Sequence, residues 1–174
     1  MHIAKDNYRE ESEIDKLTNL YNKATTERIC KNLCENLKDG NHVALYIIDL
    51  DHFKKAKNNT FWHQYGDRIL SEFALQLKLI FRTQDCVGMF GGDEFVIMIM
   101  GSLSEDVIKN KAQTILQATR EFHIDGKPSC ITASIGIAVS SLHGADYQFL
   151  FLTADKALYS VKNKGRDNFC FSVP

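Results

Sequence analysis

Two adjacent carboxylates follow two glycines in the run Gly91-Gly92-Asp93-Glu94-Phe95, between two apolar stretches that predict strands. Glycines accept positive φ angles and let a phosphate ester come close to the main chain. Acids at the tip of such a hairpin are within reach of water and of a metal ion. The alternative interpretation is a plain Gly-Gly turn with solvated acids, and the choice between the two depends on the rest of the chain.

Two further acids, Asp49 and Asp51, close an apolar run that predicts a strand buried on both faces. Carboxylates at the end of such a strand are costly to bury unless a charged group meets them. A divalent cation is one such partner, because Mg²⁺ prefers one or two carboxylates together with phosphate oxygens and water. Asp49 and Asp93 come from neighbouring strand ends and could share one ion. Asp51 is either a further ligand or the N-cap of the short helix expected next.

Groups that could bind phosphate occur in two places along the chain. The main-chain N–H groups of His52, Phe53 and Lys54 would form a helix N-terminus, which attracts anions, and the Lys54 side chain adds positive charge. Lys162 and Arg166 could both reach a triphosphate, whose charge needs more than one cation. Taken alone, a basic helix end is more often a complement to the helix dipole.

The elements that must position these residues follow from hydrophobic periodicity. Helical spacing is found in residues 22–37, 64–81, 104–122 and 147–162, and strand patterns are found in 43–50, 86–90, 95–100, 131–139 and 168–172. Hairpins are mixed with helical crossovers in this order, which indicates an α+β domain with helices packed on the faces of a sheet. A turn is expected at residues 125–128.

Composition narrows the class of protein. The 174 residues, 25% of them charged, predict one globular domain at 15–174 after a helical lead-in or linker stub at 1–14. A net charge of −1 argues against nucleic acid as a partner. No apolar run approaches the roughly 20 residues that span a bilayer, so no direct membrane contact is expected from this segment. Five irregularly spaced cysteines suit free thiols in a reducing, cytoplasmic setting.

Several ordered motifs resemble those of one family, the GGDEF domains of diguanylate cyclases, and the resemblance runs from Asp15 to Phe169. Besides the glycine-acid run, the matching segments are Asp15-Lys16-Leu17-Thr18-Asn19-Leu20-Tyr21-Asn22, Asp49-Leu50-Asp51-His52-Phe53-Lys54, His63 with Gly66 and Asp67, Ser134-Ile135-Gly136-Ile137-Ala138, Ala154-Asp155-Lys156-Ala157-Leu158-Tyr159, and 162–166. One such motif would be weak evidence, whereas the full set in the right order is highly specific.

The resemblance implies a central, mostly antiparallel sheet flanked by helices, similar to nucleotidyl cyclases and polymerase palms. It also implies a site. The metal, Mg²⁺ or Mn²⁺, would be held by Asp49, the Leu50 carbonyl, Asp93 and Glu94, and Glu94 would lie beside the ribose 3′-hydroxyl as ligand or base. The residues that would bind the GTP substrate are Asn58 and Asp67 at guanine, and His52, Phe53, Lys54, Gly91, Gly92, Lys162 and Arg166 at the phosphates.

The implied reaction is attack of the 3′-oxygen of one GTP on the α-phosphorus of another, which gives cyclic di-GMP and two pyrophosphates. Each domain holds one GTP, so a symmetric homodimer is needed for turnover. Arg82-Thr83-Gln84-Asp85 resembles the inhibitory R-x-x-D motif of the family, which implies that cyclic di-GMP binds there and inhibits. An ordinary helix-end arginine is the alternative.

Four departures from the family pattern keep a second interpretation open. Residues 55–57 carry one extra residue, so that Asn59 rivals Asn58 as the guanine reader; in addition, Trp62 replaces a glycine, Met89 an arginine and Asp167 an asparagine. None of them is a predicted metal ligand. The alternative to the enzyme is a catalytically weak module that binds GTP or cyclic di-GMP as a sensor. Synthesis of a mixed dinucleotide, which Asp67 argues against, and a purely structural role are the remaining alternatives. The short lead-in suggests a piece of a longer signalling protein.

Overall fold

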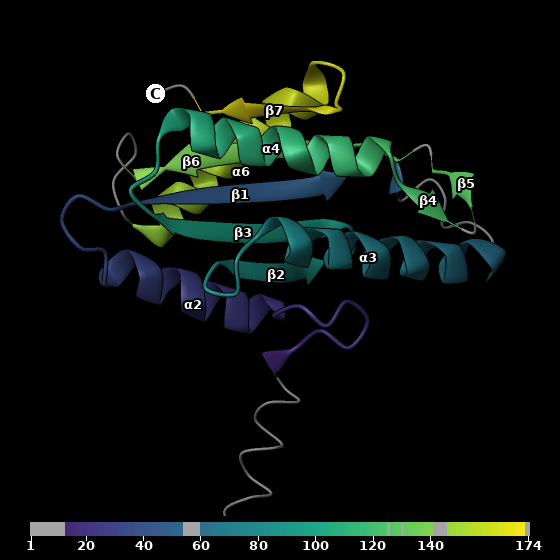
Figure 1. Cartoon of the computed structure of the whole chain (residues 1–174), viewed down its shortest axis with the longest axis horizontal. Helices are drawn as coiled ribbons and strands as arrows, with labels where there is room; N and C mark the ends of the chain where they lie inside the picture. Colours follow the sequence, from purple (N-terminus) through teal and green to yellow (C-terminus); the bar gives the residue numbers. More distant parts are fainter. Residues whose placement is uncertain (1–12, 54–59, 125, 130, 141–145, 173–174) are drawn as a thin grey trace, which may run out of the picture.

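A five-stranded sheet forms the centre of the molecule in the computed structural model (Figure 1). The described residues are 13–53, 60–124, 126–129, 131–140 and 146–172, with the backbone alone described for 60–63. The strands follow the order β2-β3-β1-β6-β7 across the sheet. Their bounds are Cys86–Gly91 for β2, Glu94–Gly101 for β3, His42–Leu50 for β1, Ala133–Val139 for β6 and Asn168–Phe171 for β7.

The central strand β1 pairs antiparallel with β3 on one side and with β6 on the other. The hairpin partners β2 and β3 are also antiparallel, and β6 and β7 form the parallel pair. A sheet that is mostly antiparallel with helices on its faces confirms the α+β expectation. The register sets Asp49 opposite Glu94 on β3 and opposite Ser134 on β6, which fixes the surroundings of the first predicted metal ligand.

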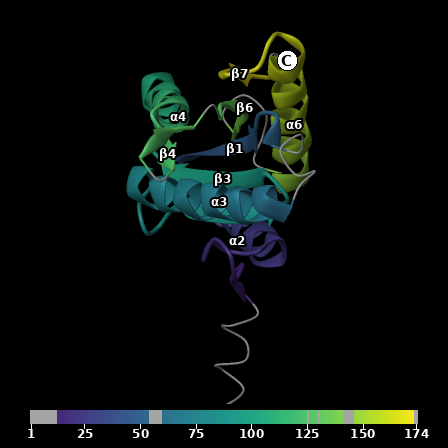
Figure 2. The ribbon, with the colours of Figure 1, turned by 90° about the vertical axis from the view of Figure 1, so that its right-hand side faces the viewer.

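Two helices cover each face of the sheet (Figures 1 and 2). Helices α3 (Thr60–Ile80) and α4 (Glu105–Arg120) pack on one face, and α2 (Lys23–Glu35) and α6 (Tyr147–Asn163) pack on the other. The side chains of β1 alternate between the two cores, with Tyr46 and Ile48 in one and Leu45 and Ile47 in the other. Burial on both faces explains why this strand reads as an unbroken apolar run.

Close packing of α6 on β6 depends on Gly136. A Cβ atom at this position would lie 2.0 Å from the main-chain oxygen of Ala154 and 2.4 Å from the main-chain nitrogen of Leu158. The small residues Ser134, Gly136 and Ala138, which alternate along β6, therefore form the surface on which α6 lies. This contact determines where the last turn of α6, with Lys162, reaches the end of the sheet.

The edge strand β2 is covered by the segment that precedes α2. The Tyr21 N–H donates to the Val87 oxygen at 3.4 Å, and the Met89 N–H donates to the Tyr21 oxygen at 2.8 Å. Ile14 pairs with Tyr21 in an isolated bridge, so the opening motif folds into a turn against the sheet. Most of the predicted lead-in, residues 1–12, lies outside the described residues.

The predicted elements agree with the observed ones to within a few residues. Asn22 and Ser104 are N-caps rather than helical residues, because their side chains accept hydrogen bonds from Thr25 and Val107 N–H groups. Helix α3 begins at Thr60, four residues before the periodic pattern. The expected turn lies within a small hairpin of β4 (His123–Ile124) and β5 (Lys127–Pro128), whose two-residue strands are too short to show an alternating pattern.

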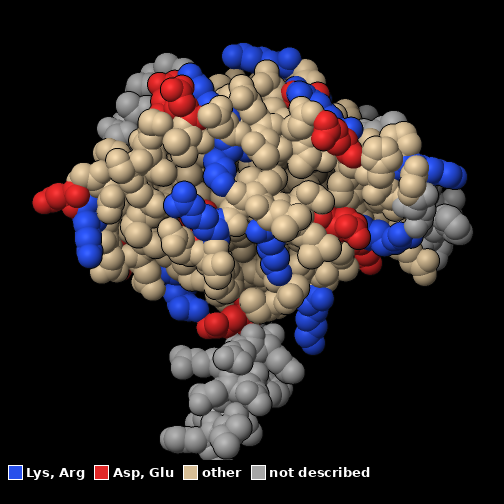
Figure 3. All heavy atoms as spheres, in the orientation of Figure 1, with Lys and Arg blue, Asp and Glu red and all other residues tan. Residues whose placement is uncertain are grey.

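None of the helices among the described residues combines the length and apolarity needed to cross a membrane. On the face shown in Figure 3, acidic and basic side chains are interspersed rather than gathered by sign. This mixture agrees with the near-neutral net charge of −1.

Candidate active site at the strand ends

The glycine-acid run forms the tip of the β2–β3 hairpin. Gly92 and Asp93 make the turn, and the pairing register shifts between Met89 and Gly91. The backbone of Gly91 has φ +135° and that of Gly92 has φ +64°, conformations that side-chain-bearing residues rarely adopt. No described atom lies within 4 Å of a Cβ built at either glycine. The main chain at this tip is therefore open to a ligand.

Asp49 and Glu94 lie side by side on one face of the sheet. They are directly opposite each other in the antiparallel register of β1 and β3, a position in which side chains share a face. Burial raises the pKa of Glu94, the Asp49 charge raises it further, and Lys162 acts in the opposite direction. The structure thus brings together two acids that are 45 positions apart in the sequence (94 − 49).

A cation from α6 meets this acidic pair. The Lys162 ammonium lies 2.7 Å from an Asp49 carboxylate oxygen, and the two side chains are 31% and 14% exposed. Asp155, two turns earlier on the same helix, contributes to the field that raises the pKa of Glu94. Among the described residues, the acids Asp49, Glu94 and Asp155 outnumber the nearby Lys162. The excess of negative charge favours a bound cation.

The hairpin turn also approaches the end of β1 through the main chain. The Leu50 N–H donates to the Asp93 oxygen at 3.2 Å, and Asp93 itself is buried. Residues 49, 50, 93 and 94 therefore lie close together. Across residues 13–53, 60–124 and the later described ranges, no group of three or more His, Cys, Asp or Glu side chains forms a ready metal site. The donor set is nevertheless all oxygen, which fits a magnesium-type ion completed by phosphate oxygens and water.

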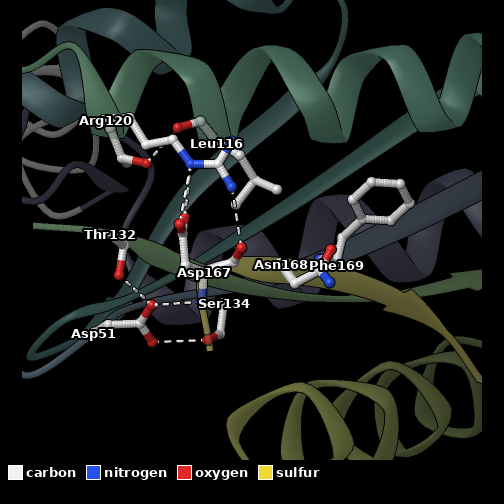
Figure 4. A network of polar contacts seen from close by, with 9 residues as sticks. Asp51, Leu116, Arg120, Thr132, Ser134, Asp167, Asn168 and Phe169 are labelled. Carbon is white, nitrogen blue, oxygen red and sulfur yellow. Dashed lines mark hydrogen bonds and ion pairs between the residues drawn. The ribbon is translucent and has the colours of Figure 1, made fainter. Parts of the chain in front are cut away.

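Asp51 makes contacts that neither of its two predicted roles includes. Its carboxylate accepts hydrogen bonds from the Thr132 hydroxyl at 2.7 Å, from the Ser134 hydroxyl at 2.7 Å and from the Asp167 N–H at 3.1 Å (Figure 4). The Asp51 side chain is fully buried. These bonds tie the end of β1 to β6 and to the loop after α6.

Arg166 lies just beyond α6 (Tyr147–Asn163), after the C-cap Lys164 and Gly165. The helix ends in a Schellman motif, in which Gly165 has φ +113° and the Arg166 N–H donates to the Val161 oxygen at 3.1 Å. The Arg166 guanidinium then lies 4.0 Å from Asp51. Both basic residues predicted to bind phosphate are therefore placed at the end of the sheet that carries the acids.

The loop after β1 is described only in part. His52 is exposed with φ +61°, and Phe53 is buried with its ring against Gly66 on α3, where an added Cβ would lie 3.2 Å away. Asp67, the predicted guanine reader, is the next residue and is exposed. It therefore lies next to the predicted phosphate-binding segment. Lys54, Asn58 and its rival Asn59 lie outside the described residues.

The predicted product-binding motif lines a separate cavity of about 330 Å³. Arg82 and Asp85 form a tight turn, in which the Asp85 carboxylate accepts the Arg82 N–H at 2.8 Å. This turn immediately precedes β2, whereas the glycine-acid tip follows the same strand. Lys78 adds a second cation to the cavity, and its ammonium also donates to the Asn19 oxygen at 2.6 Å.

Sequence reasoning missed several residues of these two regions. Lys78 carried no motif; it lies in the last turn of α3 and reaches the cavity beside Arg82 through the fold. Arg120 and Thr132 carried no motif either, because each reaches its partner only through the packing of separate elements. Asp155 belongs to one of the family-like motifs, but no role beside Glu94 was assigned to it.

Comparisons with known proteins agree with this geometry. The family model described as "Diguanylate cyclase, GGDEF domain" matches residues 12–168. The diguanylate cyclase DgcP of Pseudomonas aeruginosa is 34% identical over 170 residues, which cover 95% of this chain and 25% of that protein. The probable diguanylate cyclase DgcC of Escherichia coli is 32% identical over 155 residues, 88% of this chain and 41% of that protein. The cyclic di-GMP phosphodiesterase PdeR of Escherichia coli is 31% identical over 161 residues, 92% of this chain and 24% of that protein.

Two solved structures illustrate the similarity in fold. One is the diguanylate cyclase SiaD in complex with its activator SiaC from Pseudomonas aeruginosa, with a TM-score of 0.80 and 26% identity over 97% of this chain and 66% of that one. Another is a microbial GGDEF domain studied for its interaction with cyclic di-GMP, with a TM-score of 0.79 and 27% identity over 94% of this chain and 99% of that one. The chain spans between a quarter and two fifths of the curated relatives named above.

Proposed function

This chain belongs to the diguanylate cyclase GGDEF domain family, and from that premise we propose that it condenses two GTP molecules into cyclic di-GMP and two pyrophosphates. The observation that carries the proposal is the acidic pair of Asp49 and Glu94, set opposite each other beside an open glycine tip and met by Lys162. A module that only binds a nucleotide has little need for these acids.

The reacting atoms are the ribose 3′-oxygen of one GTP and the α-phosphorus of the other. The new oxygen–phosphorus bond forms as the bond to pyrophosphate breaks, and Glu94 takes the hydroxyl proton. Burial and the Asp49 charge raise the pKa of Glu94, which makes it a better proton acceptor than an exposed glutamate. Asp49, the Leu50 carbonyl and Asp93 would hold the ion, Mg²⁺ or Mn²⁺. When bound, this ion supplies positive charge to the phosphates and lowers the pKa of the attacking hydroxyl.

The remaining residues bind and orient the substrate. Lys162 and Arg166 would contact the β- and γ-phosphates from the end of α6, and the open main chain at Gly91 and Gly92 lets the nucleotide approach. Asp67 suits guanine because a carboxylate accepts from the N1–H and the 2-amino group, whereas adenine offers it an acceptor edge. The other predicted contacts come from His52, Phe53, Lys54 and Asn58.

Two copies must meet for turnover, because one domain holds one GTP. A dyad places the 3′-hydroxyl of each GTP at the α-phosphorus of the other, so both bonds of the cyclic product form by the same chemistry. The proposed partner is therefore a second copy of the chain. At low protein concentration the initial rate should rise more steeply than in proportion to the protein.

The test is to incubate concentrated protein with GTP and Mg²⁺ and to identify the products by mass. The proposal expects cyclic di-GMP with two pyrophosphates for each cyclic product, and no cyclic product from Glu94→Gln. A matched control is Glu35→Gln, which removes an exposed carboxylate from the end of α2. Pyrophosphate without a cyclic dinucleotide would contradict the proposal.

A second candidate, a sensor of cyclic di-GMP, is favoured by the cavity that Arg82, Asp85 and Lys78 line. Two cations suit the two phosphodiesters of the ligand, and Asp85 suits a guanine edge. In the enzyme, the same binding would be product inhibition. Binding of cyclic di-GMP without turnover of GTP would identify the sensor, and turnover that falls as cyclic di-GMP is added would identify the inhibited enzyme.

A further inference from the structure

The loop that carries Arg166 has an unusual backbone. Gly165, Arg166 and Asp167 have φ angles of +113°, +67° and +46° in succession. Glycine adopts such angles freely, but residues with side chains do so at a cost in free energy. Asp is among the residues that tolerate this region best. A run of this kind persists only where surrounding contacts hold it, so the contacts made by this loop indicate what it is for.

One of these contacts comes from Arg120, the last residue of α4. Its Nε lies 3.0 Å from each carboxylate oxygen of Asp167, and its Nη2 donates to the main-chain oxygen of Asp167 at 3.1 Å (Figure 4). One guanidinium therefore holds both the side chain and the backbone of a single residue. Such a contact defines a backbone position more tightly than a bond between two side-chain ends.

Asp51 holds the same residue from the other side. It accepts the Asp167 N–H at 3.1 Å, while the hydroxyls of Thr132 and Ser134 fix its carboxylate. The N–H, the main-chain oxygen and the carboxylate of Asp167 are thus all bound, by the end of β1 and by α4. The neighbouring guanidinium of Arg166 lies 4.0 Å from Asp51, beside the candidate active site.

We propose that the Arg120–Asp167 pair positions Arg166 for the triphosphate, so that Arg120 and Asp167 are positioning residues for nucleotide binding. The inference rests on the proposed function and extends it to two residues outside the predicted site. The Arg120 and Asp167 side chains are 47% and 37% exposed, so the pair contributes little to global stability. Its effect should therefore be seen in nucleotide affinity rather than in unfolding.

Charge gives the pair a second role in the same proposal. Asp167 stands where the family usually has asparagine, so this chain has a negative charge next to an arginine meant for phosphate. Arg120 neutralises that charge. Removal of Arg120 alone should therefore weaken triphosphate binding in two ways. The loop loses the contact that holds it, and the uncompensated Asp167 carboxylate repels the phosphates. Removal of both charges should restore part of the loss.

The experiment measures calorimetric affinity for 3′-deoxy-GTP with Mg²⁺, a ligand that lacks the attacking hydroxyl and cannot be cyclised. We expect Arg120→Gln to bind it about tenfold more weakly than the unmodified chain. Arg120→Gln with Asp167→Asn should recover about threefold of that loss, since the repulsion is gone. Affinity for 3′-deoxy-GMP, which lacks the β- and γ-phosphates, should stay unchanged in both variants.

The matched control is Arg28→Gln, which breaks another exposed arginine–carboxylate pair, 2.8 Å from Glu13, away from the site. The decisive comparison adds Arg120→Gln to a chain that already carries Arg166→Ala and Asp167→Asn, in which no uncompensated carboxylate can remain. If Arg120 then acts only through Arg166, its loss has no further effect on affinity for 3′-deoxy-GTP. A further loss of about threefold or more in that background, or equal losses for the mono- and triphosphate in Arg120→Gln, would overturn the proposal. Failure of the unmodified chain to bind 3′-deoxy-GTP would instead contradict the proposed function.

Discussion

The two ends of β2 differ in what they offer a ligand. After the strand, the glycine tip meets Asp49, Glu94 and Lys162, an open site rich in acids. Before the strand, Arg82 and Lys78 line a cavity of about 330 Å³ with apolar walls. Acids that need a cation suit phosphoryl transfer, and cations in a cavity suit the binding of a finished phosphodiester. One six-residue strand therefore separates a candidate site for chemistry from a candidate site for binding.

Because the two ends of β2 offer different chemistry, substitutions at one end should leave the property of the other end unchanged. A change at the acidic end should alter turnover and leave cyclic di-GMP binding intact, and a change at the cavity end should do the reverse. If a substitution at either end alters turnover and cyclic di-GMP binding equally, the two ends do not have separate roles.

The largest effect is expected for Glu94→Gln at the acidic end. Loss of the proton acceptor should lower kcat by about a thousandfold. Affinity of cyclic di-GMP for the cavity, measured by calorimetry, should stay within about twofold of the unmodified chain. A fall in that affinity as large as the fall in kcat would remove the distinction between the two ends.

The next largest effect concerns the support beneath the acidic end. Gly136→Ala would push a methyl group into the Ala154 main chain, which flexible side chains cannot relieve. We expect a loss of about 3 kcal/mol in the free energy of unfolding, measured by urea denaturation. Gly40→Ala is a control for the loss of a glycine as such, because nothing lies within 4 Å of its added Cβ. Its φ of +78° means that alanine at this position is strained even without a clash. An equal loss in both variants would mean that close packing of α6 is not what Gly136 provides.

Arg82→Ala should act at the cavity end. It removes the guanidinium expected to bind phosphate, and we expect about thirtyfold weaker cyclic di-GMP binding. The initial rate of GTP turnover, measured with product removed enzymatically, should not fall. Arg28→Ala, on the outer part of α2, is the matched control. Unchanged cyclic di-GMP affinity in Arg82→Ala would leave the cavity without its proposed ligand.

The smallest effect is expected for Asn22→Ala, at the junction between the cavity-lining segment and α2. Its side chain caps α2 by accepting from the Thr25 N–H at 3.0 Å. We expect about 1 kcal/mol less stability, with kcat unchanged. Ser104→Ala, the equivalent change at α4, should cost a similar amount and gives the scale for a cap distant from the cavity. A large change in kcat for Asn22→Ala would show that the cavity-lining segment controls the acidic end.

Much of the acidic end could be predicted because its signals are local. The glycine-acid tip, the strand ending at Asp49 and the basic end of α6 each read directly from adjacent residues. The face on which Asp49 lies could not be predicted, because a strand buried on both faces has no alternating pattern. Only the pairing of Asp49 with Glu94 shows which face Asp49 occupies. That pairing depends on the register of the whole sheet, which a single segment of sequence does not specify.

The contacts around Asp167 could not be predicted for a different reason. The substitution of asparagine by Asp167 was visible, but its partner Arg120 lies 47 residues away on a helix that packs on the opposite face from α6. A positive φ at a residue other than glycine also leaves no reliable mark in the sequence. Lys78 joins the cavity in a similar way, through the turn at Asn19.

The most direct test of the central claim is whether Asp49 links nucleotide binding to a divalent cation. Affinity for 3′-deoxy-GTP would be measured in Mg²⁺ and in EDTA, for the unmodified chain and for Asp49→Asn. The account predicts that EDTA weakens binding to the unmodified chain and has little effect on Asp49→Asn, whose affinity in Mg²⁺ is already low. Equal binding by the unmodified chain in Mg²⁺ and EDTA, or undiminished Mg²⁺ dependence in Asp49→Asn, would contradict it.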